Sequence, residues 1–151
     1  MQQLPQLDGS RLGFWGWSYG GYFTLYAMEH TDMFKSGVAV APVSDWRLYD
    51  SIYTERYMGL PKDNEKGYHD SAPVNFAADL KGKLLEVHGT SDDNVHMQNT
   101  IQMVNNLIDA GTQFHLMVYP GKTHGIAGKS ARTHLFHMID DHFLETLAPG
   151  K

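Results

Sequence analysis

The chain has 151 residues, of which 42% are hydrophobic and 19% charged, and its formal net charge is -5. This length and balance suit one globular domain with a buried core, and an acidic chain without clustered Lys and Arg argues against nucleic acid as the main partner. No cysteine is present, which excludes disulfides, thiolate metal sites and a cysteine nucleophile, and no apolar stretch approaches the roughly 20 residues of a membrane span.

Four short apolar runs predict β-strands, and each ends at a glycine, a proline or a polar turn. They cover residues 11–17, 37–41, 83–88 and 114–119. Runs this continuous are typical of strands that are buried on both faces of a parallel sheet. Because helical segments separate the runs, their order predicts an α/β fold in which right-handed crossovers place helices against the sheet.

Helical segments lie between and after these strands. The first is expected from about Gly20 to about His30, and residues 44–73, rich in tyrosine and without a clean period, predict an irregular helical excursion. A helix over residues 95–110, stopped by Gly111, has an apolar stripe of Met97, Ile101, Val104 and Ile108. A helix over residues 130–147 has a stripe of Leu135, Met138, Ile139, Phe143 and Leu147.

A serine motif joins the first predicted strand to the first predicted helix. Residues 16–20, Gly-Trp-Ser-Tyr-Gly, fit Gly-x-Ser-x-Gly, the strand–turn–helix motif that exposes a nucleophilic hydroxyl. Its two glycines, with Gly21 behind them, would remove side chains that collide where strand and helix pack closely. The amide of Tyr19, at the positive end of the helix, would face a developing oxyanion. Ser18 is the candidate nucleophile, and the alternative is a glycine-rich turn with an incidental serine.

An active serine needs a histidine base, and the histidine needs a carboxylate that holds its tautomer. In the α/β folds that carry this serine motif, the acid and then the histidine follow the serine along the chain. Asp92 and Asp93 follow the third predicted strand, and His124 with a glycine follows the fourth. The carboxyl ends of parallel strands meet at one edge of a sheet, so an acid and His124 would lie near Ser18. Either aspartate could instead start the next helix.

A group of histidines and aspartates near the C-terminus raises the alternative of a metal site. It comprises His134, His137, Asp140, Asp141 and His142. These residues interleave with the apolar stripe of an amphipathic helix, and no other ligand cluster supports them. We therefore expect neither a metal ion nor another cofactor.

Five sequence blocks together resemble the C-terminal part of the prolyl oligopeptidase family of serine peptidases, and within it the dipeptidyl peptidase IV branch. They are Gly-Trp-Ser-Tyr-Gly-Gly-Tyr (16–22), Ala-Val-Ala-Pro-Val-Ser (39–44), the tyrosine-rich stretch 49–59, His-Gly-Thr-Ser-Asp-Asp-Asn-Val-His (88–96) and His-Gly-Ile (124–126). The resemblance spans nearly the whole chain. It implies the α/β-hydrolase fold and a triad of Ser18, Asp92 and His124.

The same resemblance implies a substrate site in the irregular excursion. An apolar pocket for proline or alanine would be formed by Val43, Trp46, Tyr49, Tyr53 and Val95. Aromatic walls suit proline because its flat ring has no N–H to leave unpaired. Tyr49 would also face the free amino end of the substrate, and Asn94 would hydrogen-bond a substrate backbone carbonyl. The alternative for the tyrosines is plain packing.

Family members also carry an N-terminal β-propeller, which clamps the substrate's amino terminus, and the first half of the hydrolase domain. We expect residues 1–151 to form a single partial α/β-hydrolase domain of about four parallel strands, without either part. The missing half would supply the second oxyanion donor, a tyrosine in this branch. The strand at 11–17 would then be an exposed edge, and we expect the chain to form homo-oligomers through it.

The leading interpretation is a serine peptidase module that acts on peptide substrates and releases dipeptides after proline or alanine, compatible with a periplasmic or secreted parent protein. An esterase or acylaminoacyl peptidase of the same fold is one alternative, because a triad alone does not select the acyl substrate. The other is a catalytically incompetent fragment that acts only as a folding or assembly unit.

Overall fold

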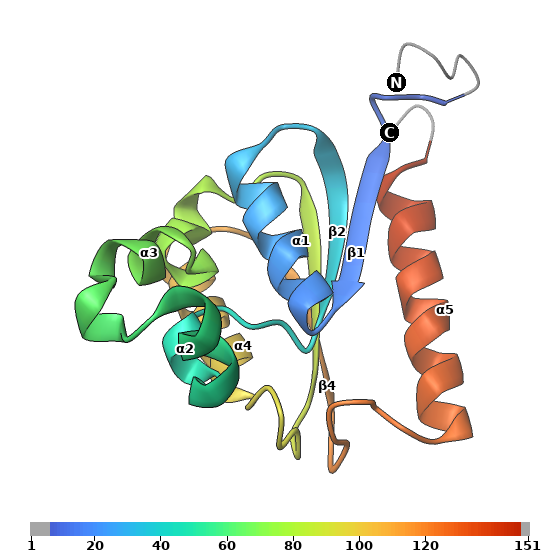
Figure 1. Cartoon of the computed structure of the whole chain (residues 1–151). Helices are drawn as coiled ribbons and strands as arrows, with labels where there is room; N and C mark the ends of the chain where they lie inside the picture. Colours follow the sequence, from blue (N-terminus) through green and yellow to red (C-terminus); the bar gives the residue numbers. More distant parts are fainter. Residues whose placement is uncertain (1–6, 149–151) are drawn as a thin grey trace.

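The computed structural model describes residues 7–148 and contains one sheet of four parallel strands (Figure 1). Their order across the sheet is their order along the chain: β1 (Leu12–Trp17), β2 (Phe34–Val40), β3 (Lys83–Gly89) and β4 (His115–Tyr119). The predicted α/β architecture is confirmed. β2 begins three residues before the predicted start at residue 37, because Lys35 and Ser36 continue the strand although they interrupt the apolar run.

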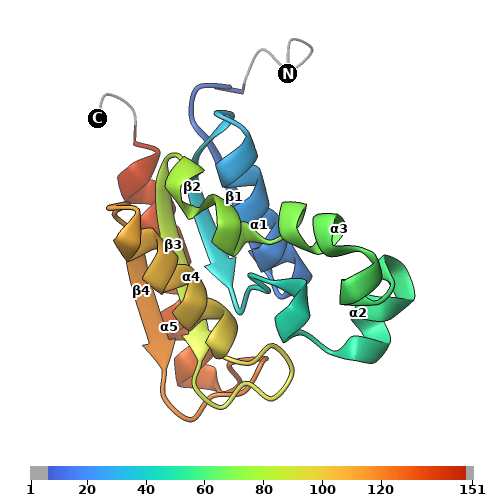
Figure 2. The same ribbon diagram turned by 90° about the vertical axis from the view of Figure 1, so that its left-hand side faces the viewer.

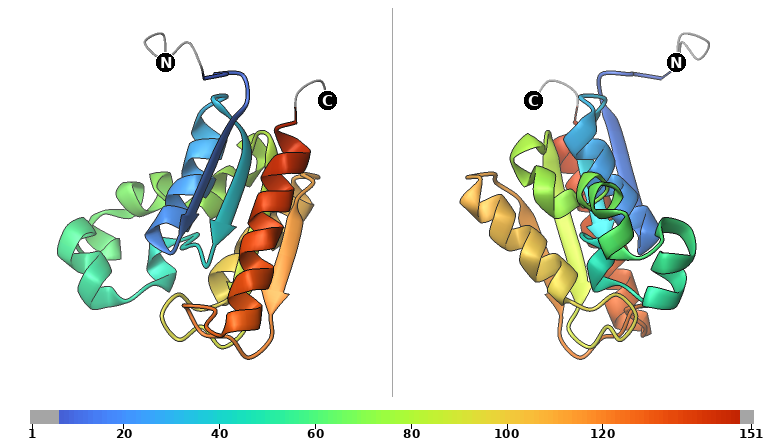
Figure 3. Two further views of the ribbon diagram at one scale, coloured as in Figure 1. Left: turned by 90° about the vertical axis from the view of Figure 1, so that its right-hand side faces the viewer. Right: turned by 60° about the vertical axis from the view of Figure 1, so that its left-hand side comes forward.

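Three long helices cover the two faces of the sheet. α1 (Tyr19–His30) and α4 (Gln98–Asp109) lie on one face, and α5 (Lys129–Thr146) lies on the other (Figures 1 and 3). The α1/α4 side buries Leu25, Met28, Leu84, Met103 and Leu107, and the α5 side buries Val38, Val40, Leu85, Val87, Leu135 and Ile139. The predicted stripe of α5 is confirmed for Leu135, Met138, Ile139 and Phe143, whereas Leu147 lies one residue beyond the helix. None of the helices within residues 7–148 is long and apolar enough to cross a membrane.

Only the two central strands are buried on both faces. β2 is buried from Ser36 to its end and β3 from Leu84 to its end, whereas β1 and β4 are the edges of the sheet and expose several side chains. Trp15 of β1, for example, is 45% exposed. Burial on both faces, expected from the continuous apolar runs, thus holds only for β2 and β3, since an apolar run does not distinguish an edge strand from a central one. The expectation that the first strand is an exposed edge is confirmed.

The excursion between β2 and β3 consists of short helices, and its part around residues 51–70 projects beyond the sheet (Figure 2). They are η1 (Trp46–Leu48), α2 (Ser51–Met58), η2 (Pro61–Asp63), α3 (Glu65–Asp70) and η3 (Pro73–Asp79). Asp45, Asp50 and Asn64 each accept a backbone N–H from the first turn of the element that follows, which satisfies donors that a helix start leaves free. These caps explain how helices so short remain ordered without an amphipathic period.

The buried face of α4 differs from the predicted stripe. Its buried residues are Asn99, Thr100, Met103 and Leu107. Ile101 and Ile108, which the stripe placed in the core, are 52% and 62% exposed. The first turn of α4 directs polar groups inward because they bind other elements: Asn99 Oδ1 accepts the Ser44 N–H at 3.0 Å, and Thr100 pairs with a histidine of β3. The predicted stripe is wrong, since helical spacing alone does not reveal such partners.

Candidate active site

Ser18 occupies the turn between β1 and α1. Its backbone has φ 59° and ψ -117°, a conformation that a non-glycine residue adopts only when its surroundings hold it. Those surroundings are hydrogen bonds: the Ser18 N–H donates to Val40 O at 2.8 Å, and Ser18 O accepts from the Tyr22 N–H at 2.9 Å. The residue is only partly buried. The strand–turn–helix setting predicted for this serine is therefore present.

Two of the three glycines around Ser18 are required by close packing. A Cβ on Gly16 would lie 2.3 Å from the backbone of Gly20, and a Cβ on Gly21 would lie 2.8 Å from Val40 O. A Cβ on Gly20 would meet nothing within 4 Å. The expectation that Gly20 itself removes a colliding side chain is wrong, because Gly20 provides the bare backbone against which Gly16 packs.

Asp92, in the loop after β3, is the aspartate that meets His124. Its side chain is fully buried, and its Oδ2 accepts a hydrogen bond from Nδ1 of His124 at 2.8 Å. Its Oδ1 accepts the backbone N–H groups of Asn94 and Val95, each at 3.0 Å. Because a carboxylate only accepts, Nδ1 of His124 must carry the proton, which leaves Nε2 as its proton acceptor. Asp93 is exposed.

The loop that carries His124 is tied to the strand that carries Ser18. The Trp17 indole N–H donates to the backbone oxygen of His124 at 2.8 Å. Arg132 of α5 donates to Gly125 O at 2.9 Å, and its guanidinium lies 5.3 Å from the centroid of the Trp17 ring. These contacts set the position of the histidine backbone, while the side chain of His124 stays 23% exposed.

The loops after β3 and β4 are clamped to each other by backbone contacts. The Thr90 N–H donates to Tyr119 O at 3.1 Å, and the Ser91 N–H donates to Lys122 O at 3.0 Å. A Cβ on Gly89 would lie 2.2 Å from Lys122 O, so only glycine allows this approach. The clamp brings the loop of Asp92 and the loop of His124 together at the carboxyl ends of their strands.

Among the hydrogen bonds of residues 7–148, none joins the Ser18 hydroxyl to His124. Such bonds are often long in an enzyme without substrate. Tyr19 is the first residue of α1, so its backbone N–H has no acceptor within the helix and is free for an oxyanion. The arrangement can thus hold a nucleophile, a base with its acid, and one oxyanion donor.

An aromatic cavity of about 520 Å³ lies beside the serine turn. Its lining residues are Tyr19, Tyr22, Trp46, Tyr53, Thr54, Tyr57, Met58 and Ser71. Trp46 and Tyr53, two of the predicted pocket residues, belong to this lining, and their ring centroids are 6.2 Å apart. The cavity is therefore built by the serine turn, η1 and α2 together, on the projecting side of the molecule.

The other predicted pocket residues lie around this cavity without lining it. Val43 and Val95 are buried in the same apolar cluster as Trp46. The Tyr49 hydroxyl donates to Asn94 Oδ1 at 2.8 Å, which connects the excursion to the loop of the acid. Burial is the main cause that raises the pKa of Tyr49, so this hydroxyl stays a protonated donor at neutral pH.

Several lining residues escaped prediction. Tyr22 follows the serine motif by two residues, in the block 16–22. Tyr57 follows Tyr53 by one helical turn, which is a spacing that could have identified it. Thr54 is buried, and its hydroxyl has no hydrogen-bond partner in the described part of the chain. Burial raises the pKa of Tyr22. The wall of the cavity thus carries hydroxyl groups as well as rings.

The residues weighed as a metal site do not converge. Across residues 7–148, no group of three or more His, Cys, Asp or Glu side chains could hold a metal ion. His134 instead pairs with the Tyr119 hydroxyl at 2.7 Å, and the buried His142 donates from Nε2 to Lys83 O at 3.2 Å.

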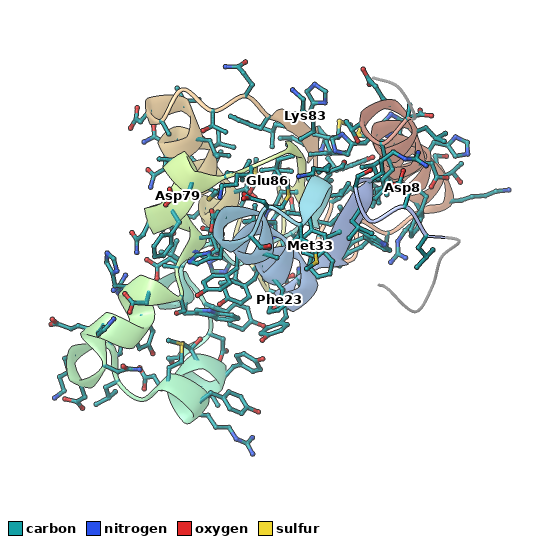
Figure 4. The ribbon with its side chains drawn as sticks, turned by 90° about the horizontal axis from the view of Figure 1, so that it is seen from above. Asp8, Phe23, Met33, Asp79, Lys83 and Glu86 are labelled. Carbon is teal, nitrogen blue, oxygen red and sulfur yellow. The ribbon has the colours of Figure 1, made fainter. Side chains whose placement is uncertain are left out.

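Two carboxyl groups outside the site are buried: Glu29 on α1 and Glu86 on β3, of which Figure 4 labels Glu86. Neither Glu29 nor Glu86 has a hydrogen-bond partner among the residues that the structure describes. Burial raises the pKa of Glu29 to about 9, with smaller contributions from the negative charges of Asp79 and Glu86. Burial likewise raises the pKa of Glu86 to about 8. Both groups are therefore protonated in the folded chain at neutral pH.

Comparison with known proteins identifies a matching family and several similar proteins. The sequence profile of the prolyl oligopeptidase family matches residues 1–150. Dipeptidyl peptidase 4 of Bos taurus is 47% identical over 144 residues, which is 92% of this chain and 19% of the relative. The crystal structure of dipeptidyl peptidase 4 of Porphyromonas gingivalis is 46% identical with a TM-score of 0.93, over 96% of this chain and 21% of that one.

A more distant structure shares the fold. An acylaminoacyl peptidase in complex with Z-Gly-Gly-Phe-chloromethyl ketone superposes with a TM-score of 0.89 at 24% identity, over 99% of this chain and 26% of that one. The chain spans about a fifth of the length of the curated relatives it matches.

Proposed function

The chain belongs to the prolyl oligopeptidase family, and from this premise we propose that it is the triad-bearing part of a serine peptidase of the dipeptidyl peptidase type. The observation that carries the proposal is the buried Asp92 carboxylate, bound to Nδ1 of His124, on loops that share one end of the sheet with the strained turn of Ser18. The relatives at 46–47% identity are named dipeptidyl peptidase 4.

The proposed chemistry begins with attack of Ser18 Oγ on the scissile carbonyl. Nε2 of His124 takes the serine proton and later gives it to the leaving amine, while Asp92 holds Nδ1–H and stabilises the imidazolium that forms. The Tyr19 N–H would bind the developing oxyanion. Water, activated by His124, then hydrolyses the acyl-enzyme on Ser18 and restores the hydroxyl.

Specificity for proline or alanine is proposed to come from the aromatic wall. Trp46 and Tyr53 line the cavity beside Ser18, and flat rings bind the proline ring without leaving a donor unpaired. The Tyr49 hydroxyl donates a hydrogen bond of 2.8 Å to Asn94 Oδ1, in the loop of Asp92. In the proposed complex this hydrogen bond would break, so that Tyr49 faces the substrate amino group and Asn94 binds its backbone carbonyl.

We further propose that residues 1–151 act as a partial domain. Relatives about five times longer carry this segment, so the second oxyanion donor and the clamp for the substrate amino terminus would come from outside it. Loss of one oxyanion donor typically lowers the rate by about 10²–10³-fold. The alternative of an esterase or acylaminoacyl peptidase is supported only by the fold shared with the acylaminoacyl peptidase structure. The alternative of an incompetent fragment is tested by the labelling experiment below.

The test is covalent labelling of the 151-residue chain with a fluorophosphonate probe, with Ser18→Ala as the control. We expect labelling that disappears in Ser18→Ala. Hydrolysis of Gly-Pro and Ala-Pro chromogenic amides then reports the peptidase specificity. An unlabelled chain contradicts an assembled site in it, and a labelled chain that hydrolyses only esters contradicts the dipeptidyl proposal for these residues.

A further inference from the structure

A second histidine, His88, is buried against the acid: its Nε2 lies 3.3 Å from Asp92 Oδ2, the same oxygen that His124 binds. We propose that His88 is a positioning residue for the Asp92–His124 pair, and that the hydroxyl of Thr100 on α4 holds its ring in place. The proposal rests on the function proposed above. The mechanism described there uses neither residue, and both are fully buried.

His88 connects three elements through its two ring nitrogens. Nδ1 lies 2.7 Å from Thr100 Oγ1 on α4. Nε2 lies 2.8 Å from the backbone oxygen of Val95 and 3.3 Å from Asp92 Oδ2. The ring therefore fills the space between the end of β3, the loop of the acid and the first turn of α4.

The chemistry of these partners decides where the proton lies. A backbone carbonyl can only accept, so Nε2 must carry a hydrogen to bond Val95 O at 2.8 Å. Burial is the main cause that lowers the pKa of His88, so the ring is neutral and Nδ1 presents a lone pair. Thr100 must then donate its hydroxyl hydrogen to Nδ1. The Val95 carbonyl thus fixes the tautomer, and the Thr100 hydroxyl satisfies the other ring nitrogen and holds the ring in this orientation.

This tautomer completes the surroundings of the acid. Asp92 Oδ1 accepts two backbone N–H groups, and Oδ2 accepts the Nδ1–H of His124. The Nε2–H of His88 lies near the same Oδ2, 3.3 Å away from nitrogen to oxygen. The opposite tautomer would turn a lone pair toward both Val95 O and Asp92 Oδ2. That repulsion would displace the loop of the acid, and with it the carboxylate that orients His124.

Two substitutions at Thr100 separate this role from packing. Thr100→Val keeps the shape and removes the hydroxyl, whereas Thr100→Ser keeps the hydroxyl and removes a methyl group. If Thr100 only fills space, serine is the worse replacement. If its hydroxyl holds the His88 ring, valine is the worse one, because it leaves the buried Nδ1 without a partner. Thermal unfolding of each variant shows whether the chain remains folded.

The measurements are ¹⁵N NMR of the histidine rings, assigned with a His124→Gln chain, and the rate of fluorophosphonate labelling at Ser18. For Thr100→Val we expect a shifted Nδ1 signal of His88, which has lost its partner, weakening of the protected Nδ1–H signal of His124, and labelling slower by about tenfold to 10²-fold, as misplaced catalytic groups produce. Thr100→Ser should resemble the wild type in all three.

The ring spectra need no reactive serine, so the two proposals fail separately. Unlabelled wild type with the expected ring spectra contradicts the proposed function and supports the positioning role. Labelled wild type with an unchanged Thr100→Val spectrum and rate overturns the positioning role. A Thr100→Ser chain as impaired as Thr100→Val also overturns it, since packing alone would then explain the loss.

Discussion

Trp17 and His124 are joined by a hydrogen bond of 2.8 Å from the indole N–H to the histidine backbone oxygen. Trp17 directly precedes Ser18 and ends β1, whereas His124 follows β4 at the other edge of the sheet. One side chain thus links the proposed nucleophile to the proposed base across two intervening strands.

Trp17→Phe should weaken that link while it keeps an aromatic ring in place. Loss of the N–H leaves His124 O without its partner, so we expect the free energy of unfolding to fall by about 1 kcal/mol and Ser18 labelling to slow by about tenfold or more. Trp15→Phe is the control, because Trp15 lies on the same strand and is largely exposed. Equal slowing in both variants would contradict a specific role of the indole N–H.

Asp92→Asn should abolish most of the activity without unfolding the chain. The amide is nearly isosteric, yet it cannot hold the Nδ1–H tautomer of His124, and in serine triads such a change lowers kcat by about 10⁴-fold. Asp93→Asn removes the same charge one residue away at an exposed position and should label like the wild type. Comparable labelling of the two variants would refute Asp92 as the acid.

Gly16→Ala and Gly20→Ala should shift stability in opposite directions. A Cβ on Gly16 would lie 2.3 Å from backbone that cannot move aside, and overpacking of this kind destabilises by about 1–3 kcal/mol. Gly20 lies in α1 with open space where an added Cβ would point, so alanine should raise the free energy of unfolding by about 0.5–1 kcal/mol through helix propensity. Denaturant unfolding measures both, and a tolerated Gly16→Ala would show that strand and helix can separate.

The buried carboxyls should make the chain less stable as the pH rises. Their pKa values rise on folding from 4.5 to about 9 for Glu29 and about 8 for Glu86, chiefly through burial. The folded chain therefore binds more protons than the unfolded one, and this stabilisation, complete below pH 4.5, is lost progressively as the pH rises toward about 9.

Glu86→Gln should remove part of this loss. We expect little change in the free energy of unfolding at acidic pH and a gain of about 1–3 kcal/mol at alkaline pH, since no buried carboxylate then has to ionise. Urea unfolding at several pH values measures the profile. Glu65→Gln, at an exposed position of α3, is the control, and a Glu86→Gln profile parallel to the wild type would contradict the burial argument.

The free edge of β1 should make the chain self-associate. Within residues 7–148, β1 pairs only with β2, and its Trp15 is exposed. Phe23 and Met33, which Figure 4 labels, are exposed as well. Such an edge is a template for another strand. Analytical ultracentrifugation should show concentration-dependent dimers that Trp15→Lys reduces, whereas Ile101→Lys, on the exposed face of α4, leaves them intact. A monodisperse wild-type monomer would rule the idea out.

Much of the fold was predictable because central parallel strands are continuous apolar runs. β3 was located to within one residue even though Glu86 interrupts its apolar sequence. The inner face of α4 was not predictable, since Asn99 and Thr100 are buried by partners on other elements. Periodicity reports which residues could be apolar neighbours, and it is silent on polar groups that find a partner elsewhere.

The candidate site was predictable where motif order carried the information. Asp92 and His124 follow strands whose ends must meet, and the structure brings them to 2.8 Å. The role of His88 was not predictable, although the residue begins the block 88–96, because a histidine at the end of an apolar run resembles a turn residue. Its partner is Thr100, twelve residues later on α4, and only the packing of α4 on β3 brings the two together.

The position of β1 also has a consequence for hydrogen exchange. β3, which leads to the acid, is paired on both sides, whereas β1, which leads to Ser18, is paired on one. The amide protons of β1 should therefore exchange through local openings that leave β3 closed. In such an opened state the hydrogen bond between Asp92 and His124 would persist, while the turn of Ser18 moves away from it. The proposed catalytic groups therefore belong to two cooperative units that differ in stability.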